Sequence, residues 1–366
     1  MIKLKNVEFI RVFLIIAIVF LHMFIDRKWN LCTLFPDISI YQTMKSSIAH
    51  SNNCVEGFFI IAGFFLVYTF KPITKLKDFI IKKYIRLSPV ILFSIFLCVI
   101  GCILGTMHFK LIPNLLTIFL LNSFVIKITV GNNPILWYTS AFFAGLLLYF
   151  CIIKYLPQKI KYWAIGILVV SAYVILEILQ HGSFKSPLKN YYYVLNIGFL
   201  RAVGGIGLGC LIGFLYKNIL SKYNLPEKNK ILKISYTFLE VILLGFAFWW
   251  CMCTHKNLNN IFIVFIFASL LLLFLMKKGY LSQILDNDLW VKLGKYQYSI
   301  YVVHFVIIRI LGLALWKKHP EFVASHPILP VVIMLAIILA VGIFAYHVVE
   351  LPCAKYLKDR LIGKES

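Results

Sequence analysis

The sequence predicts an all-α integral membrane protein with about ten transmembrane helices. Of its 366 residues, 61% are hydrophobic and only 14% are charged, which is too apolar for a soluble chain of this length. Apolar runs long enough to cross a bilayer recur from one end of the chain to the other. The basic residues are gathered in short clusters between these runs. A polytopic helical bundle accounts for all three observations.

Ten apolar runs have the length that a membrane-spanning helix needs, about 17–25 residues. They lie at 8–25, 54–70, 88–107, 135–153, 163–180, 195–216, 234–254, 258–276, 298–316 and 328–349. An eleventh run, 113–126, is shorter and contains Pro113 and Asn122 near its ends. Hydropathy alone does not decide whether this run crosses the membrane.

The basic clusters decide the question, because loops on the cytoplasmic side carry an excess of Lys and Arg. With ten spans, the following clusters fall on the same side as the amino terminus: 71–86, 154–161, 217–233, 277–295 and 355–364. If 113–126 crossed the bilayer, the clusters at 154–161 and 217–233 would lie outside. We therefore expect ten spans in the cell membrane, both termini in the cytoplasm, and a short re-entrant or interfacial helix at 113–126.

The composition and charge of the chain also indicate how many domains it has and which partners its charges meet. No linker, composition break or internal repeat divides the chain, so we expect a single membrane domain over 1–366, with its core at about 5–355 and no soluble C-terminal domain. The net charge of +23 lies in clusters that suit loops facing an anionic lipid surface. Membrane lipids, rather than nucleic acid, are therefore the expected partners of these charges.

The nine cysteines show no paired spacing of zinc ligands, and we expect no metal site. Cys251 and Cys253 flank a single residue near a helix end, which is a weak signal. Cys32 and Cys54 bracket one loop. They could form a disulfide if that loop faces an oxidising compartment, or remain as two free thiols.

Two polar residues lie in the first apolar run, "RVFLIIAIVFLHMF". Ten apolar residues separate Arg11 from His22. In an α-helix, eleven steps of about 100° come within about 20° of three full turns, so both side chains share one face, about 16 Å apart along the axis. Ionisable groups in spans are costly and usually mark a site or pathway. Alternatively, the arginine snorkels to the headgroups and the histidine is simply hydrated.

The second span begins "CVEGFFIIAGFF" and enters from the outer side, so Glu56 lies at about the depth of His22. A carboxylate there could orient an imidazole and stabilise its protonated form, as a base in acyl transfer requires. It could instead interact with the helix dipole at the start of the span. Gly57 and Gly63 permit close approach of another helix.

A cationic cluster precedes the third span on the cytoplasmic side, within "KKYIRLSP". Lys82, Lys83 and Arg86 together suit a ligand with several phosphates. The same residues are also typical of a positive-inside membrane anchor.

Four further residues are candidates for an acceptor site or a structural role. Trp137 lies at an outer interface, where aromatic belts are common. Arg201 opens "RAVGGIGLGCLIG", in which the glycines of 205–213 recur every fourth residue and indicate a helix-packing face. His304 ends "LGKYQYSIYVVH", and Glu350 lies in "YHVVELP" at the cytoplasmic end of the last span.

Taken in order, these motifs resemble the membrane acyltransferase-3 family. The motifs are the Arg11–His22 spacing, "VEGFFIIAGF", "RLSP", the Leu136–Trp137 pair, "LGKYQYSIYVVH" and "VVELP", and they extend over about residues 5–355. Members of that family transfer an acyl group, usually acetyl, from cytoplasmic acyl-CoA to a hydroxyl of a glycan or lipid-linked sugar at the outer face. They typically have ten core helices.

The resemblance implies that His22 is the catalytic residue and that Arg11 belongs to the same essential pair, with Glu56 at the acidic position of the "GFF" motif. Ala62 stands where serine is usual before the glycine, which argues against that serine as a nucleophile. With no soluble domain after the last span, the resemblance implies a member that acts alone or with a separate partner.

In the acyl-CoA site, the family's two cytoplasmic arginines, three residues apart, correspond to Lys83 and Arg86. The lysine keeps the charge but loses the bidentate guanidinium fork.

We expect an O-acyltransferase that uses acyl-CoA, most simply acetyl-CoA, as donor substrate and holds no bound cofactor. His22 would act as a general base toward a sugar hydroxyl or form an acyl-histidine, and both routes remain open. One alternative is a transporter or flippase of a lipid-linked glycan or other anion, with the intramembrane charges forming its pathway. A non-catalytic scaffold for a glycan assembly complex is the other.

Overall fold

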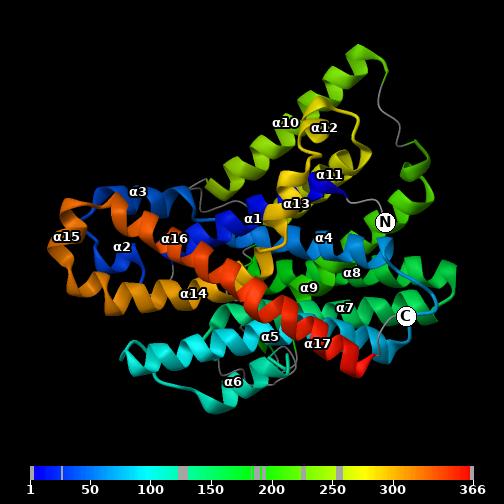
Figure 1. The fold of residues 1–366 in the computed structure, drawn as a ribbon. Helices are drawn as coiled ribbons and strands as arrows, with labels where there is room; N and C mark the ends of the chain where they lie inside the picture. The colour runs from blue at the N-terminus through cyan, green and yellow to red at the C-terminus, as the bar shows by residue number, and fades with distance from the viewer. Residues whose placement is uncertain are drawn as a thin grey trace. The chain divides into compact units, whose positions relative to one another are not determined.

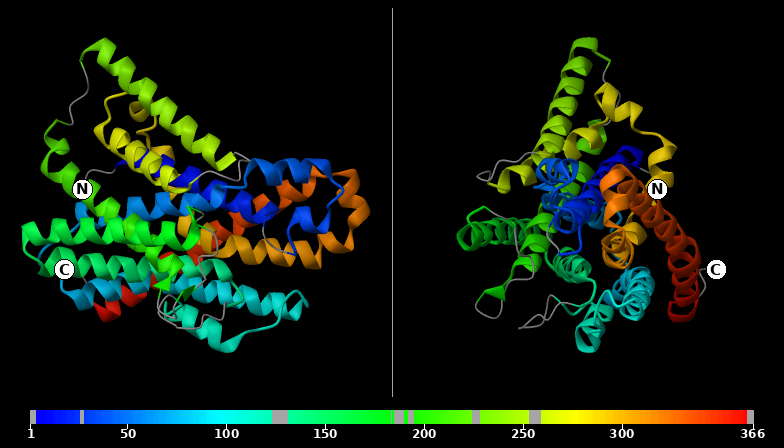
Figure 2. Two further views of the ribbon diagram at one scale, coloured as in Figure 1. Left: turned by 180° about the vertical axis from the view of Figure 1, so that it is seen from behind. Right: turned by 90° about the vertical axis from the view of Figure 1, so that its left-hand side faces the viewer.

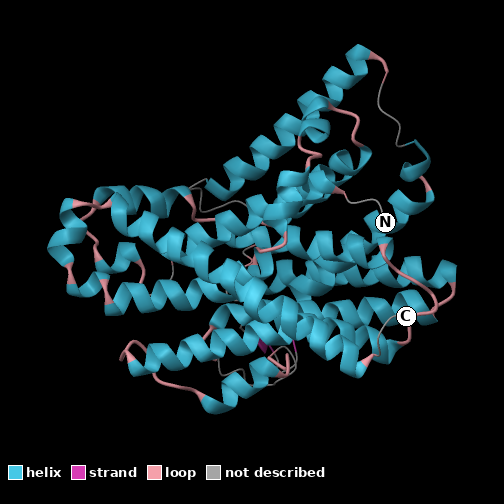
Figure 3. Ribbon diagram, viewed as in Figure 1, coloured by secondary structure: helices cyan, strands magenta, loops and turns pink. Residues whose placement is uncertain are grey.

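The computed structural model describes residues 4–25, 28–122, 131–182, 184, 190–191, 195–223, 228–252 and 259–362 (Figure 1). This part of the chain is almost entirely helical (Figure 3), which confirms the predicted fold class. The strands that it contains are two residues long each. They pair antiparallel, with Asn190 opposite Asn196.

The apolar runs predicted to span the membrane coincide with helices. Within the described residues, nine helical segments are long and apolar enough to cross a bilayer. They are Lys5–Phe24, Ser39–Tyr68, Leu76–Ile103, Pro134–Tyr155, Gln158–Gln180, Ile197–Lys222, Lys230–Cys251, Gln297–Lys318 and Ile328–Leu361. The run at 258–276 corresponds to a shorter apolar helix of 16 residues, Ile261–Met276.

The chain folds into two compact units, and each is built from three separate stretches. Unit 1 comprises Met1–Leu14, His50–Thr74 and Ala144–Lys295. Its elements are the start of α1 (Lys5–Phe24), η1 (Ser51–Asn53), α4 (Cys54–Tyr68), most of α7 (Trp137–Tyr155), α8 (Gln158–Gln180), β1 (Asn190–Tyr191), β2 (Leu195–Asn196), α9 (Ile197–Asn218), η3 (Leu220–Tyr223), α10 (Lys230–Met252), α11 (Ile261–Met276), α12 (Tyr280–Ile284) and α13 (Asp288–Gly294). Helix α9 packs against α4, α8 and α11 (Figure 2).

Unit 2 comprises Ile15–Ala49, Lys75–Phe143 and Tyr296–Ser366. Its elements are the rest of α1, α2 (Leu31–Leu34), α3 (Ser39–Ser47), α5 (Leu76–Ile103), α6 (Leu111–Ile118), η2 (Pro134–Leu136), the start of α7, α14 (Gln297–Ala314), η4 (Trp316–Lys318), α15 (Pro320–Ser325), α16 (Ile328–Phe344), the π-helix η5 (Ala345–Glu350) and α17 (Leu351–Leu361). Helix α14 packs against α5 and α16.

Glycines bring the backbones of α4 and α9 into direct contact in unit 1. A Cβ on Gly63 would collide with the carbonyl oxygen of Ile206, and a Cβ on Gly209 would collide with that of Ile60. Only glycine permits an approach this close. The predicted packing roles of Gly63 and of the glycine face 205–213 are therefore confirmed.

The contacts between α4 and α9 also give their relative direction. Glu56 at the start of α4 meets Arg201 at the start of α9, and Val67 near the end of α4 meets Gly213 near the end of α9, so the two helices run parallel. With α5, α7 and α8 between them in sequence, parallel spans require that α6 does not cross. Helix α6 has eight residues, about 12 Å, against a hydrocarbon core of about 30 Å. Residues 123–126 of the predicted run lie outside the described residues.

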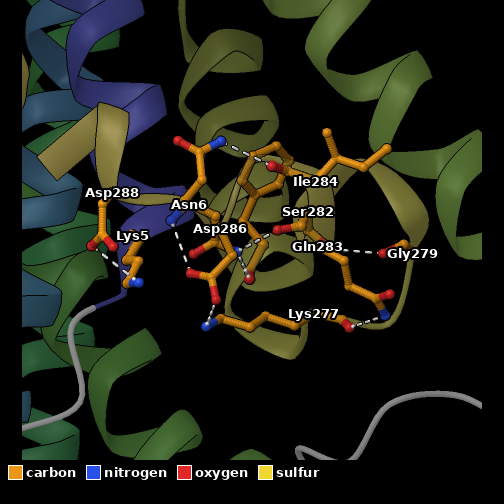
Figure 4. A network of polar contacts seen from close by, with 11 residues as sticks. Lys5, Asn6, Lys277, Gly279, Ser282, Gln283, Ile284, Asp286 and Asp288 are labelled. Atoms are coloured by element: carbon orange, nitrogen blue, oxygen red, sulfur yellow. Dashed lines mark hydrogen bonds and ion pairs between the residues drawn. The ribbon is translucent and has the colours of Figure 1, made fainter.

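A polar network fixes the start of α1 within unit 1 (Figure 4). Asn6 donates through Nδ2 to the carbonyl oxygen of Phe274 at 2.6 Å, and its backbone N–H donates to Asp286 Oδ1 at 3.3 Å. Lys5 pairs with Asp288 at 3.0 Å. These contacts hold the first turn of α1 to α11, to the segment that joins α12 and α13, and to the first residue of α13.

Candidate active site

The predicted catalytic residue, His22, meets His304 in unit 2. His22 lies in the last turn of α1, and its Nδ1 is 3.2 Å from Nε2 of His304 on α14. The two ring centroids are 5.2 Å apart. His304 is fully buried and His22 is half-buried. Two residues that the sequence placed in separate motifs thus form one pair.

The hydrogen bonds around this pair assign the proton positions of both neutral rings. Nδ1 of His304 is 3.2 Å from the carbonyl oxygen of Ile300, which can only accept, so this nitrogen carries hydrogen and Nε2 carries the lone pair. Nδ1 of His22 faces that lone pair and also the carbonyl oxygen of Ile18 at 3.0 Å. It must therefore be a donor. The proton-accepting nitrogen of His22 is consequently Nε2.

Aromatic side chains surround the histidine pair. Phe305 meets His22 edge to face at 5.4 Å between centroids, and Tyr301 lies 5.8 Å from His304. The ring of Tyr138 is 5.3 Å from that of Tyr301, and Trp137 is its neighbour in sequence. The predicted Trp137 is thus linked to the pair through Tyr138 and Tyr301. These apolar rings lower the local dielectric constant and so strengthen electrostatic interactions at the histidine pair.

Arg11 lies on the same continuous helix as His22, so the predicted helical spacing holds. Its Nη1 is 2.9 Å from both carboxylate oxygens of Glu8, one turn earlier in unit 1. This ion pair was not predicted, although a spacing of three residues is typical of ion pairs on helices.

The predicted Glu56 and Arg201 form a buried ion pair in unit 1. Arg201 Nε donates to Glu56 Oε1 at 2.6 Å, and both side chains are almost completely buried. Tyr173 donates to the other carboxylate oxygen at 3.5 Å. Arg201 also donates to the carbonyl oxygens of Phe184 and Asn52, at 3.0 and 3.3 Å. Each buried charge therefore has a partner, as a low-dielectric interior requires.

Glu56 and His22 belong to different units, and the orienting role of Glu56 toward His22 stays a prediction. The alternative of an interaction with the helix dipole agrees with the position of Glu56, which lies in the first turn of α4. Sequence reasoning missed Tyr173. The one feature of the sequence that could have indicated Tyr173 is its polar hydroxyl group within the apolar run 163–180.

The cationic cluster lies on α5 in unit 2, where Lys82 and Arg86 are exposed and Lys83 is half-buried. Lys83 Nζ lies 5.5 Å from the ring centroid of Phe79. Arg86 is close enough to Glu350 to interact electrostatically with it. Glu350, in turn, accepts a hydrogen bond from Ser299 Oγ at 2.5 Å. The structure therefore brings the predicted Arg86 and Glu350 together at the start of α14.

The start of α14 is also tied to α5 beside this cluster. Tyr298 donates to the carbonyl oxygen of Leu87 at 2.7 Å and interacts electrostatically with Arg86. Helix α14 thus begins beside the cationic cluster and carries His304 two turns later. About 10 Å of helix separates its first residue from His304.

A comparison with models of protein families shows to which family the chain belongs. Residues 4–347 match the model of the acyltransferase-3 family, which is described as an acyltransferase domain. The chain belongs to this acyltransferase family. Comparisons with curated proteins and with solved structures give no match.

The described cysteines of the acyltransferase are free thiols. Cys32 donates to the carbonyl oxygen of Tyr41 at 2.8 Å, and burial raises the pKa of its thiol to about 11, although the nearby Lys45 acts in the opposite direction. Cys54 Sγ lies 3.4 Å from Cys251 Sγ. The open question of a Cys32–Cys54 disulfide is thus resolved in favour of two free thiols, and Cys253 lies outside the described residues. Within the residues that the structure describes, no group of three His, Cys, Asp or Glu side chains could hold a metal ion.

Proposed function

We propose that this acyltransferase transfers an acyl group, most simply acetyl, from cytoplasmic acyl-CoA to a hydroxyl of a cell-surface or lipid-linked glycan. The observation that carries the proposal is the His22–His304 pair, in which Nδ1 of His22 lies 3.2 Å from Nε2 of His304. In the tautomer with hydrogen on Nδ1, the lone pair of His22 is on Nε2, the nitrogen proposed to accept the proton. In this proposal the helices span the cell membrane, and both termini lie in the cytoplasm.

In the proposed reaction, Nε2 of His22 removes the proton of the acceptor hydroxyl as the oxygen attacks the thioester carbonyl. The tetrahedral intermediate then expels the CoA thiolate, which takes up that proton from the imidazolium. Nε2 of His304 accepts a hydrogen bond from His22 Nδ1 throughout and so stabilises the imidazolium. A positioned base of this kind contributes about 10²–10⁴-fold in rate. A route through an acyl-histidine uses the same orientation of the ring.

The donor is proposed to bind along unit 2. Lys82, Lys83 and Arg86 would hold the phosphates of acyl-CoA, because clustered cations bind phosphate by charge-assisted hydrogen bonds. The slender pantetheine arm would then extend along α14 toward His304 and His22.

The test uses purified protein in detergent, where no ion gradient exists. We expect acetyl-CoA to be consumed, with release of free CoA thiol, when acceptor glycan is present, and mass spectrometry of the glycan to show one added acyl group. Movement of a glycan across vesicles only when a gradient is imposed, with no thioester cleavage, would contradict the proposal and favour a transporter.

The phosphate site predicts a specific kinetic change. Arg86→Gln is expected to raise the KM for acetyl-CoA about tenfold, since one charge-assisted hydrogen bond contributes about 1.5 kcal/mol. The same variant should use S-acetyl-pantetheine as well as wild type does, because that donor has no nucleotide phosphates. Lys77→Gln, an exposed lysine on the first turn of the same helix, is the matched control. An equal loss with both donors would argue against a phosphate contact.

A further inference from the structure

Gln297, the first residue of α14, has a buried polar side chain. It is 3% exposed, and within the described structure neither Oε1 nor Nε2 of its amide has a hydrogen-bond partner. Leaving a buried amide unpaired is costly, and native proteins retain few such groups. An unpaired donor and acceptor side by side therefore indicate a ligand that the described chain does not itself supply.

The position of Gln297 on α14 shows where such a ligand would lie. Residues four and seven positions later are Tyr301 and His304, so the three residues share one face of the helix. His304 meets His22 at the far end of this face. At the near end, the neighbouring Tyr298 interacts with Arg86 of the cationic cluster. Within unit 2, Gln297 thus lies at the end of α14 that begins beside the proposed phosphate site, about two turns before His304.

The spacing matches one part of the proposed donor. Seven residues of helix correspond to about 10 Å between Gln297 and His304. In acyl-CoA, the thioester sulfur and the carbonyl carbon of the outer amide, the one that joins β-alanine to the pantoyl unit, are about eight bonds apart. At the rise of an extended chain, this is about 9 Å. With the thioester beside the His22–His304 pair, at the level of His304, the outer amide reaches the level of Gln297.

The chemistry of that part also matches. The pantoyl unit is an α-hydroxy amide, with a carbonyl oxygen that accepts and an adjacent hydroxyl that donates. The primary amide of glutamine presents a donor and an acceptor at similar spacing. We propose that Gln297 binds the α-hydroxy amide of the pantetheine arm, donating from Nε2 to the carbonyl oxygen and accepting at Oε1 from the hydroxyl. This inference rests on the proposed use of acyl-CoA as donor.

The test compares Gln297→Met with wild type on three donors: acetyl-CoA, S-acetyl-pantetheine and S-acetyl-N-acetylcysteamine. The last donor keeps the thioester and the inner amide but lacks the pantoyl unit. Methionine has about the length of glutamine and cannot form these hydrogen bonds. We expect kcat/KM to fall about tenfold for acetyl-CoA and for S-acetyl-pantetheine, and to stay unchanged for S-acetyl-N-acetylcysteamine.

Gln180→Met is the matched control, because Gln180 ends α8 in unit 1 and its Oε1 is also buried without a partner. Its effect should be the same on all three donors. An equal loss for Gln297→Met on all three donors, or no loss on any, overturns the role of Gln297. Wild-type protein that uses none of the three thioesters instead overturns the proposed function, and this inference with it.

A second measurement uses only the wild-type protein, so it tests the proposal even if Gln297→Met fails to fold. S-acetyl-pantetheine without its pantoyl hydroxyl should be used several-fold less efficiently than the complete donor, because Oε1 of Gln297 loses its partner. Equal use of both donors overturns the proposal.

Discussion

Replacing His22 by alanine is expected to lower acyl transfer at least a hundredfold while the protein remains folded. The reason is that Nε2 of His22 is the proposed acceptor of the hydroxyl proton, and a positioned base contributes about 10²–10⁴-fold in rate. The ring is half-buried and its loss removes no part of the fully buried core. The rate is measured as CoA thiol released by purified protein, and product as O-acylated glycan by mass spectrometry.

Two companion variants make this result interpretable. His319→Ala, an exposed histidine of the short segment before α15, should retain the wild-type rate. His304→Ala should lower kcat but leave the KM for acetyl-CoA unchanged, because His304 is proposed to orient the ring of His22 and not to bind the donor phosphates. Wild-type turnover by a folded His22→Ala protein would remove His22 from the mechanism.

Replacing Arg201 by methionine is expected to destabilise the protein by about 3–5 kcal/mol, because the carboxylate of Glu56 would be left buried without its countercharge. The loss includes hydrogen bonds to the carbonyl oxygens of Phe184 and Asn52. The measurement is the midpoint of thermal unfolding in detergent, together with the fraction of protein that elutes as a single species. Arg201→Lys should fall between wild type and Arg201→Met, because lysine keeps the charge but cannot reproduce the planar fork.

The double variant Glu56→Gln with Arg201→Met separates charge imbalance from general loss of packing. Removing both charges should be less destabilising than removing Arg201 alone, since no uncompensated carboxylate remains. If the double variant were as unstable as the sum of the two single variants, the two residues would not be coupled and the ion pair would have little energetic role.

Hydropathy and charge predicted most of the fold because they act through local, repeating features of the sequence. The predicted spans coincide with helices, and 113–126 was separated correctly from them by the distribution of basic residues. The run at 258–276 is longer than α11, because Asn259 and Asn260 precede Ile261 without being part of the helix, and residue 258 lies outside the described residues.

The site was predicted less completely, because its pairs join residues that lie far apart in sequence. Glu56 and Arg201 are separated by 145 positions, and His22 and His304 by 282. Helical periodicity relates residues of one helix, so it could place Arg11 and His22, about three turns apart, on one face but could not find either long-range pair. The motifs that resemble the acyltransferase-3 family contain Glu56, His22 and His304 but not Arg201, and they do not indicate how these residues meet.

The main-chain contact between α4 and α9 has a consequence for how this acyltransferase can vary. Where two helices touch through side chains, a change in one can be absorbed by repacking in the other. At Gly63 and Gly209 no side chain lies between the backbones, so an alanine at either position would have to push the helices apart. Such a displacement would lengthen the Glu56–Arg201 contact at the same time. Substitutions at Gly63 and Gly209 are therefore restricted by the geometry of the Glu56–Arg201 ion pair, which lies two turns away.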